Sequence, residues 1–162
     1  MTIQYKEHLT HKGKDYYISD EPLCPYLESK RILFNAPNTA CWRGYIGDWL
    51  IEDNKLYLVG LRAYISKHNL NNRFDSEEIV LDYLFPGQNK IFADWFSGVL
   101  NIPSGKELQY VHGYVPLYEK EFFMKIQKGV VVKEWENNFF QRLKKRFAYK
   151  FNSLLDEMED KS

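Results

Sequence analysis

The sequence predicts an α+β fold that is mainly antiparallel β-sheet, arranged as a meander or as a barrel-like sheet. Two aromatic-rich runs with β-prone residues flank a polar turn within residues 40–61, and a similar layout recurs over residues 90–110. Aromatic residues make up 17% of the chain, and they favour strands as well as contact surfaces. Apolar spacing typical of helices is confined to a short segment near 75–85 and to the C-terminal segment.

Size, charge and cysteine content limit the possible classes of protein. A chain of 162 residues suits one domain, so we expect residues 1–162 to form a single domain. Its 22 basic and 22 acidic residues balance, so no net field attracts nucleic acid or an anionic membrane. Cys24 and Cys41 are too few for a disulfide scaffold, and we expect free thiols in a cytoplasmic protein. No apolar run approaches the roughly 18 residues of a spanning helix, which predicts no membrane segment.

Three hairpins are expected along the chain. The first covers residues 3–19, with its turn at 11–14, and a loop with one helical turn follows over residues 21–36. The second, over residues 40–61, turns at 52–55, and the third, over residues 90–110, turns at Pro103-Ser104-Gly105. Strands over 115–118, 122–126 and 130–132, joined by turns at 119–121 and 127–129, complete the predicted sheet.

Two helices are expected beside the sheet. Asp75 and Glu78 resemble a capping box before an apolar stripe, and Pro86-Gly87 ends this short helix near residues 75–85. Over residues 133–160, apolar residues recur at steps of three and four, which predicts an amphipathic helix packed on the sheet. The same apolar stripe could instead form the seam of a homodimer.

Arg43 is the first candidate for a binding residue. It lies between Trp42 and Gly44, and an arginine among aromatic residues and glycines can stack on a ring and present its planar fork to a carboxylate or phosphate. Glycine also allows a ligand to approach the backbone closely. The alternative is an internal ion pair of Arg43 with Asp48 or Glu119.

Asp48 and Asp94 precede Trp49 and Trp95 at like places in the second and third hairpins. Paired carboxylates near aromatic rings suit acid–base chemistry on a sugar ring, but each carboxylate could also simply point outward from its strand. His112 is the best candidate proton carrier, with a structural hydrogen-bonding role as the alternative. No zinc, phosphate-loop, nucleophile or dinucleotide motif occurs, so no metal or cofactor is expected.

The runs TACWRGYIGDW, DNKLYLVGL, LFPG, IFADWFSGVLNIPSG and YVHGYVPLYEKE resemble a group of small uncharacterised bacterial proteins. The resemblance covers about half of the chain, residues 39–129, through the patterns TACWRGYxGxW and FADWFxGxxxIPxG and the run YVHGY. It implies a compact intracellular bacterial protein, and it transfers no catalytic residue.

These observations favour a non-enzymatic binding or interaction protein, of an immunity or accessory type, whose partner is another protein. Aromatic and arginine side chains would supply most of the contact energy. The alternative is a small-ligand-binding protein or an enzyme with a pocket between the second and third hairpins. The candidate ligand-binding residues are Arg43, Trp42, Asp48, Asp94, Trp95 and His112.

Overall fold

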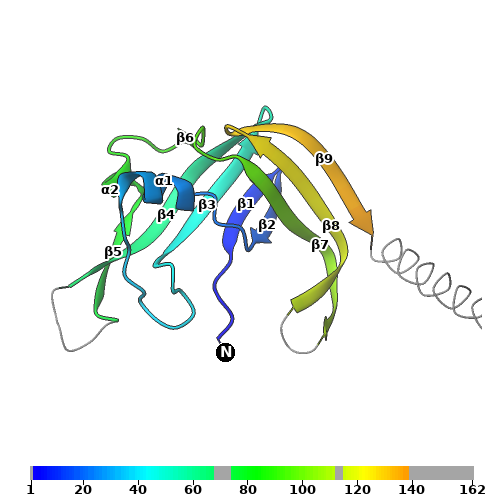
Figure 1. Cartoon of the computed structure of the whole chain (residues 1–162). Helices are drawn as coiled ribbons and strands as arrows, with labels where there is room; N and C mark the ends of the chain where they lie inside the picture. The colour runs from blue at the N-terminus through cyan, green and yellow to red at the C-terminus, as the bar shows by residue number, and fades with distance from the viewer. Residues whose placement is uncertain (1, 68–73, 112–114, 139–162) are drawn as a thin grey trace, which may run out of the picture. The chain divides into compact units, whose positions relative to one another are not determined.

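The computed structural model describes residues 2–67, 74–111 and 115–138 (Figure 1). Contacts divide the chain into two units, one formed by residues up to 102 with 123–134, and the other by residues 103–122 with the chain from 135 onward. The expected single domain over residues 1–162 stays a prediction. The site developed below lies within the first unit.

The described residues form one mixed, open sheet of nine strands with two short helices, so the fold is mainly β. The sheet order is β2-β1-β3-β4-β9-β8-β7, with β5 and β6 also paired to β4. The strands are β1 (Glu7–His11), β2 (Lys14–Ile18), β3 (Tyr45–Glu52), β4 (Lys55–Ser66), β5 (Ser76–Val80), β6 (Ile91–Phe92), β7 (Gly98–Val111), β8 (Val115–Gln127) and β9 (Val130–Asn138). The helices are α1 (Cys24–Lys30) and α2 (Leu81–Leu84).

The first two predicted hairpins are confirmed. β1 pairs antiparallel with β2, and β3 pairs antiparallel with β4. The turn between β3 and β4 is made by Asp53 and Asn54 at φ 50° and 58°, the left-handed pair that a tight hairpin turn requires. A parallel pairing of β1 with β3, in which Leu9 lies opposite Trp49, joins the two hairpins.

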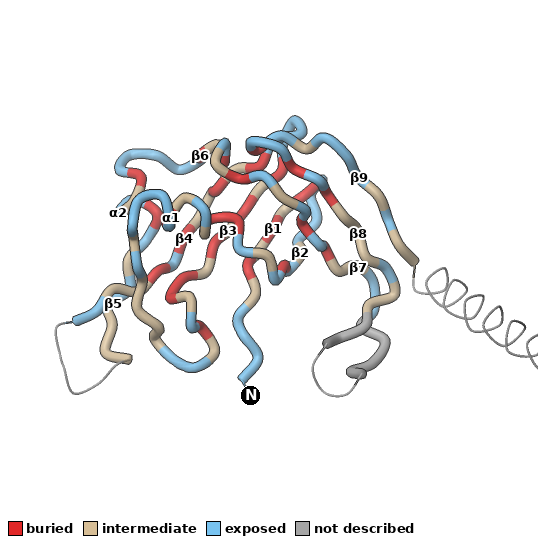
Figure 2. Tube along the Cα trace, viewed as in Figure 1, coloured by how far each residue is buried: buried red, intermediate tan, exposed pale blue. Residues whose placement is uncertain are grey.

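The core lies on one face of these strands, because successive side chains of a strand point to opposite faces. In β3 the buried residues alternate with half-buried ones from Tyr45 to Ile51, and β1 follows the same pattern (Figure 2). Burying each large aliphatic side chain contributes about 1.5–3 kcal/mol. The fully covered apolar side chains include Leu9, Ile18, Leu23, Trp49, Leu56, Leu58, Leu100, Ile102 and Met124.

α1 has Pro25 in its first turn, a position that proline favours. Its C-cap is Arg31, whose φ of 55° is left-handed and ends the helix. Its side chain Tyr26 packs against Trp95 and Phe85, with ring centroids 4.8 and 5.1 Å away. Trp95 also donates a hydrogen bond through Nε1 to the carbonyl of Pro22, just before the helix. These contacts hold α1 against Phe85 at the end of α2 and against the loop that follows β6.

Three predictions about elements before β9 are wrong. Residues 76–80 form β5 instead of helix, because their backbone pairs with β4, and only Leu81–Leu84 is helical. The third predicted hairpin does not turn at Pro103-Ser104-Gly105, since β7 runs through these residues after a two-residue β6. Residues 119–121 likewise continue β8, whereas the turn at 127–129 is confirmed by Lys128 and Gly129 at φ 46° and 79°.

The predicted C-terminal helix over residues 133–160 is replaced by strand in its first part. β9 extends to Asn138 because it lies between β4 and β8 in the sheet, and residues 139–160 lie outside the described part of the chain. The sheet is open over the described residues, so the barrel-like alternative does not hold there.

Candidate ligand-binding site

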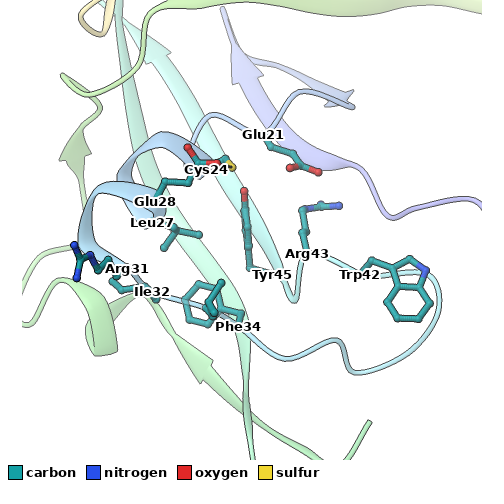
Figure 3. A pocket seen from close by; sticks show the side chains of 11 residues that line it. Glu21, Cys24, Leu27, Glu28, Arg31, Ile32, Phe34, Trp42, Arg43 and Tyr45 are labelled. Carbon is teal, nitrogen blue, oxygen red and sulfur yellow. Dashed lines mark hydrogen bonds between the residues drawn. The ribbon is translucent and has the colours of Figure 1, made fainter. Parts of the chain in front are cut away.

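A cavity of about 560 Å³ lies beside α1, between this helix, the segment that follows it and the beginning of β3 (Figure 3). Its walls combine apolar side chains with a few charged ones. The lining residues are Glu21, Cys24, Leu27, Glu28, Arg31, Ile32, Leu33, Phe34, Trp42, Arg43 and Tyr45.

The turn before β3 gives the cavity its base. Gly44 has a φ of +75°, and a Cβ there would lie 2.7 Å from the carbonyl oxygen of Asn35 and 2.8 Å from Cβ of Phe34. Only glycine accepts both the left-handed backbone and this close approach. The segment bearing Phe34 therefore packs directly on the turn, and Arg43 and Tyr45 on either side of Gly44 contribute to the cavity.

The guanidinium of Arg43 is held in place by three contacts. Nη1 donates a hydrogen bond to the carbonyl of Tyr5 at 2.7 Å, and Nε lies 3.4 Å from Oε1 of Glu7. The guanidinium carbon also lies 5.4 Å from the ring centroid of Tyr45, as in a cation–π contact. The side chain of Arg43 is only 11% exposed, so it is a largely buried cation.

Glu7 is the buried carboxyl beneath Arg43, and it is 1% exposed. Trp49 donates its indole N–H to Oε2 of this carboxyl. Burial raises the pKa of Glu7 to about 8, although the Trp49 hydrogen bond and the Arg43 charge both act to lower it. Burial and the charge of Arg43 therefore act on the pKa of Glu7 in opposite directions, and burial has the larger effect.

Several buried polar atoms at this place have no hydrogen-bond partner among the described residues. They are the Tyr45 hydroxyl and Nη2 of Arg43, together with Nε of Arg43 and Oε1 of Glu7, which lie 3.4 Å apart as an ion pair without forming a hydrogen bond. Tyr45 is 2% exposed, and its pKa is raised by burial and by the neighbouring Glu7 and Glu21. Figure 3 shows its hydroxyl pointing toward Cys24 and Glu21, away from the Phe34 side. A buried, unsatisfied polar group costs about 1–3 kcal/mol, so this group of atoms is an incomplete network.

The outer part of the cavity is more exposed. Leu33 is 94% exposed and Trp42 is 51% exposed, so both present apolar surface at the rim. Cys24 lies on α1 with Sγ 3.5 Å from Oε1 of Glu28, and burial is the main cause of its raised pKa. The exposed charges at the rim are those of Glu21, Glu28 and Arg31.

Of the predicted site residues that the structure describes, Arg43 and Trp42 alone line this cavity together. Asp48 lies on β3 with Oδ1 3.6 Å from Nδ1 of His8, beside Gly60, and does not line the cavity. Asp94 is exposed in the loop after β6, where Trp95 instead packs against α1. His112 lies outside the described residues.

The predicted ion-pair partner of Arg43 is corrected. Asp48 and Glu119 were the expected partners, but Glu7 takes this place because the parallel pairing of β1 with β3 brings it under Arg43. Sequence reasoning also missed Glu7 and Tyr45 as site residues. A signal for Glu7 was present, because it stands two residues before the buried Leu9 and so shares the inward face of that strand.

Cys24 and Cys41 are free thiols, as predicted. Within residues 2–67, 74–111 and 115–138, no group of three or more His, Cys, Asp or Glu residues is placed to hold a metal ion. None of the helices in that same part of the chain has the length and apolar character to cross a membrane.

Comparison with known proteins found no family model that matches the chain, and neither a curated sequence nor a solved structure matches it.

Proposed function

We propose that this protein is a non-enzymatic binding protein that takes a small amphipathic molecule into the cavity beside α1. The observation that carries the proposal is the cavity itself, about 560 Å³ in volume, whose lining combines apolar side chains with Tyr45 and the largely buried cation Arg43. We keep the cytoplasm as its proposed location, because both cysteines are free thiols.

The size and lining of the cavity support a small ligand. Ligand sites are typically about 300–1,000 Å³, mostly apolar, with a few polar groups that fix orientation, and a volume of about 560 Å³ lies in that range. Leu27, Ile32 and Phe34 offer an apolar wall next to the polar base. An apolar body would pack on this wall and extend toward the rim at Leu33.

The chemistry of the lining favours binding over catalysis. A guanidinium is a fixed cation in proteins, so Arg43 suits the orientation of a ligand and not proton transfer. The thiol of Cys24 has a raised pKa, which lowers its fraction of reactive thiolate. Glu7 has a pKa suited to acid–base work, but it does not line the cavity, since Trp49 and Arg43 cover its two oxygens.

The proposal is tested by titrating the protein with small probes and following the methyl NMR signals of Leu27, Ile32 and Leu33. The probes are octanoate, phenylbutanoate and naphthylacetate, each also supplied as the primary amide. At least one probe should shift the cavity methyl signals in a saturable way and leave the signal of Leu58, in the core, unchanged. Ile32→Trp should block the cavity and abolish these shifts, whereas Ile79→Trp on β5, another half-buried isoleucine, should retain them.

A second candidate is recognition of a partner protein of the immunity or accessory type. The exposed apolar side chains of Leu33 and Trp42 at the rim favour it, because aromatic and apolar anchors dominate protein interfaces. The two candidates differ in the same titration. If no probe shifts a cavity methyl signal, small-molecule binding is refuted and the rim is left as a protein-binding surface.

A further inference from the structure

We propose that Gln4 is a positioning residue, which holds the cavity wall formed by Trp42 and Arg43 and so controls how tightly a ligand is bound. This inference rests on the proposed function, because it names a residue outside the lining on which the same cavity depends. It follows from the contacts between residues 2–5, which precede β1, and residues 39–43, which lead into β3.

Trp42 and Arg43 are adjacent lining residues on the turn before β3 (Figure 3). The N–H of Gly44 closes this turn by donating to the carbonyl of Cys41 at 3.1 Å. Both lining residues lie outside the strands, so their orientation is not set by the ladder of the sheet. It depends on contacts from outside the turn, and the segment 2–5 supplies several of them.

The side-chain amide of Gln4 bonds to this stretch of chain at two points. Nε2 donates to the carbonyl of Thr39 at 2.9 Å, and Oε1 accepts from the backbone N–H of Trp42 at 3.0 Å. A glutamine amide carries donors on one atom and an acceptor on the other, so a single planar group spans the two positions. Gln4 thereby fixes the backbone of Trp42 relative to that of Thr39.

The backbone of Tyr5 completes the arrangement. Its N–H donates to the carbonyl of Ala40 at 2.8 Å, and its carbonyl accepts from Nη1 of Arg43 at 2.7 Å. Gln4 therefore holds the backbone of Trp42, and the next residue holds the side chain of Arg43. Because Gln4 and Tyr5 are neighbours in the chain, loosening Gln4 also loosens the contact of Tyr5 with Arg43.

The contacts of Gln4 lie at the surface, which separates them from the stability of the sheet. Gln4 is exposed, as are its two hydrogen bonds, and the flanking Ile3 and Tyr5 are 68% and 50% exposed. Segments with exposed hydrogen bonds and few buried apolar contacts open locally at a lower cost than the core. Losing the bonds of Gln4 should therefore loosen the wall and leave the sheet folded. A loosened wall must be ordered again when a ligand binds, which lowers affinity.

Amide hydrogen exchange tests whether Gln4 orders the wall. Gln4→Met nearly keeps the length of the side chain and removes both bonds. Gln88→Met is the matched control, because Gln88 is also exposed and does not line the cavity. The amide of Trp42 should exchange about tenfold faster in Gln4→Met than in wild type, since it loses its acceptor. The amide of Leu58, on β4, should exchange at the wild-type rate in both variants.

The NMR titration described above tests the effect on binding. The probe that binds wild type best should bind Gln4→Met about threefold to tenfold more weakly, and it should bind Gln88→Met as tightly as wild type. Gln4→Glu keeps an acceptor for the N–H of Trp42 and loses the donor to Thr39. This variant should therefore retain slow exchange at Trp42 and most of the affinity, which isolates the contact that positions the wall.

The possible failures are distinct. If no probe shifts the cavity methyl signals of the wild type, the proposed function fails and the role of Gln4 in binding fails with it. If a probe binds Gln4→Met as tightly as wild type, the cavity is still a binding site but Gln4 does not position its wall. Equal acceleration of exchange at Trp42 and Leu58 would make Gln4 a residue of general stability and would overturn the assignment. Weak binding to Gln4→Glu despite slow exchange at Trp42 would likewise overturn it.

Discussion

Replacing Glu7 by Gln tests whether the buried carboxyl holds a proton in the folded state. Glutamine has nearly the shape of a protonated glutamate, and its amide oxygen can still accept the hydrogen bond from Trp49. If burial keeps Glu7 protonated, the substitution changes stability little near pH 5. If Glu7 is instead ionised and paired with Arg43, the variant leaves a buried cation unpaired, which costs about 3–5 kcal/mol.

The sign of the pH dependence follows from the direction of the shift. The pKa of Glu7 is about 8 in the folded protein, against a reference value of 4.5. Between these values the unfolded chain has released the proton that the folded protein still holds. Stability from this group is therefore fully present below pH 4.5, decreases by about 1.4 kcal/mol for each pH unit above it, and becomes constant above about pH 8.

The assay is urea unfolding at several pH values between 5 and 9, followed by tryptophan fluorescence. The free energy of unfolding of the Glu7→Gln variant should lie within about 1 kcal/mol of wild type near pH 5, exceed it by about 2 kcal/mol near pH 6 and exceed it by several kcal/mol at pH 9. Comparison with wild type cancels other groups, such as His11, whose pKa burial lowers, and Asp20, whose pKa burial raises. Two parallel curves, with the variant less stable at every pH, would refute the reasoning and restore a charged Glu7–Arg43 pair.

Further substitutions test the packing around the cavity. Gly44→Ala should destabilise the protein by at least about 2 kcal/mol more than Gly87→Ala. Both glycines have a positive φ, but of the two only Gly44 has backbone atoms within 3 Å of the added Cβ. Chemical denaturation of both variants measures the difference. Leu58→Ala should cost about 3–5 kcal/mol and Leu33→Ala less than about 0.5 kcal/mol, since one side chain is fully buried and the other almost fully exposed, and equal melting points would contradict this. Trp49→Phe should cost about 3 kcal/mol or more in the same denaturation assay, because it leaves Oε2 of Glu7 without its donor.

Local signals in the sequence predicted the elements that depend on local geometry. Asp53 and Asn54 take the left-handed turn that their residue types favour, and the strands on either side pair as expected. The same kind of signal failed at Pro103-Ser104-Gly105, where β7 continues through a tripeptide that is typical of turns, because the strand pairs within the sheet. At residues 76–80 the pairing with β4 prevailed over a capping box, since helix propensity is a weak preference.

The candidate site was predictable only in part. Arg43 stood out because its neighbours are aromatic residues and glycines. Its partner could not be identified, since Glu7 reaches Arg43 only after β1 has paired in parallel with β3, and Glu7 and Trp49 are 42 positions apart. Tyr45 looked like one core aromatic among many, because its unpartnered hydroxyl is a property of its surroundings and not of its sequence context.

The parallel pairing of β1 with β3 makes the cavity part of a crossover connection. The chain leaves β2, passes through α1 and the Gly44 turn, and returns as β3 on the far side of β1, so the cavity walls are the crossover itself. Contacts between residues far apart in the sequence, such as those between β1 and β3, form after the local hairpins, because closing the long loop between them costs conformational entropy before the contacts stabilise the chain. A bound ligand would therefore act on a late folding step: it should slow unfolding and leave the refolding rate almost unchanged.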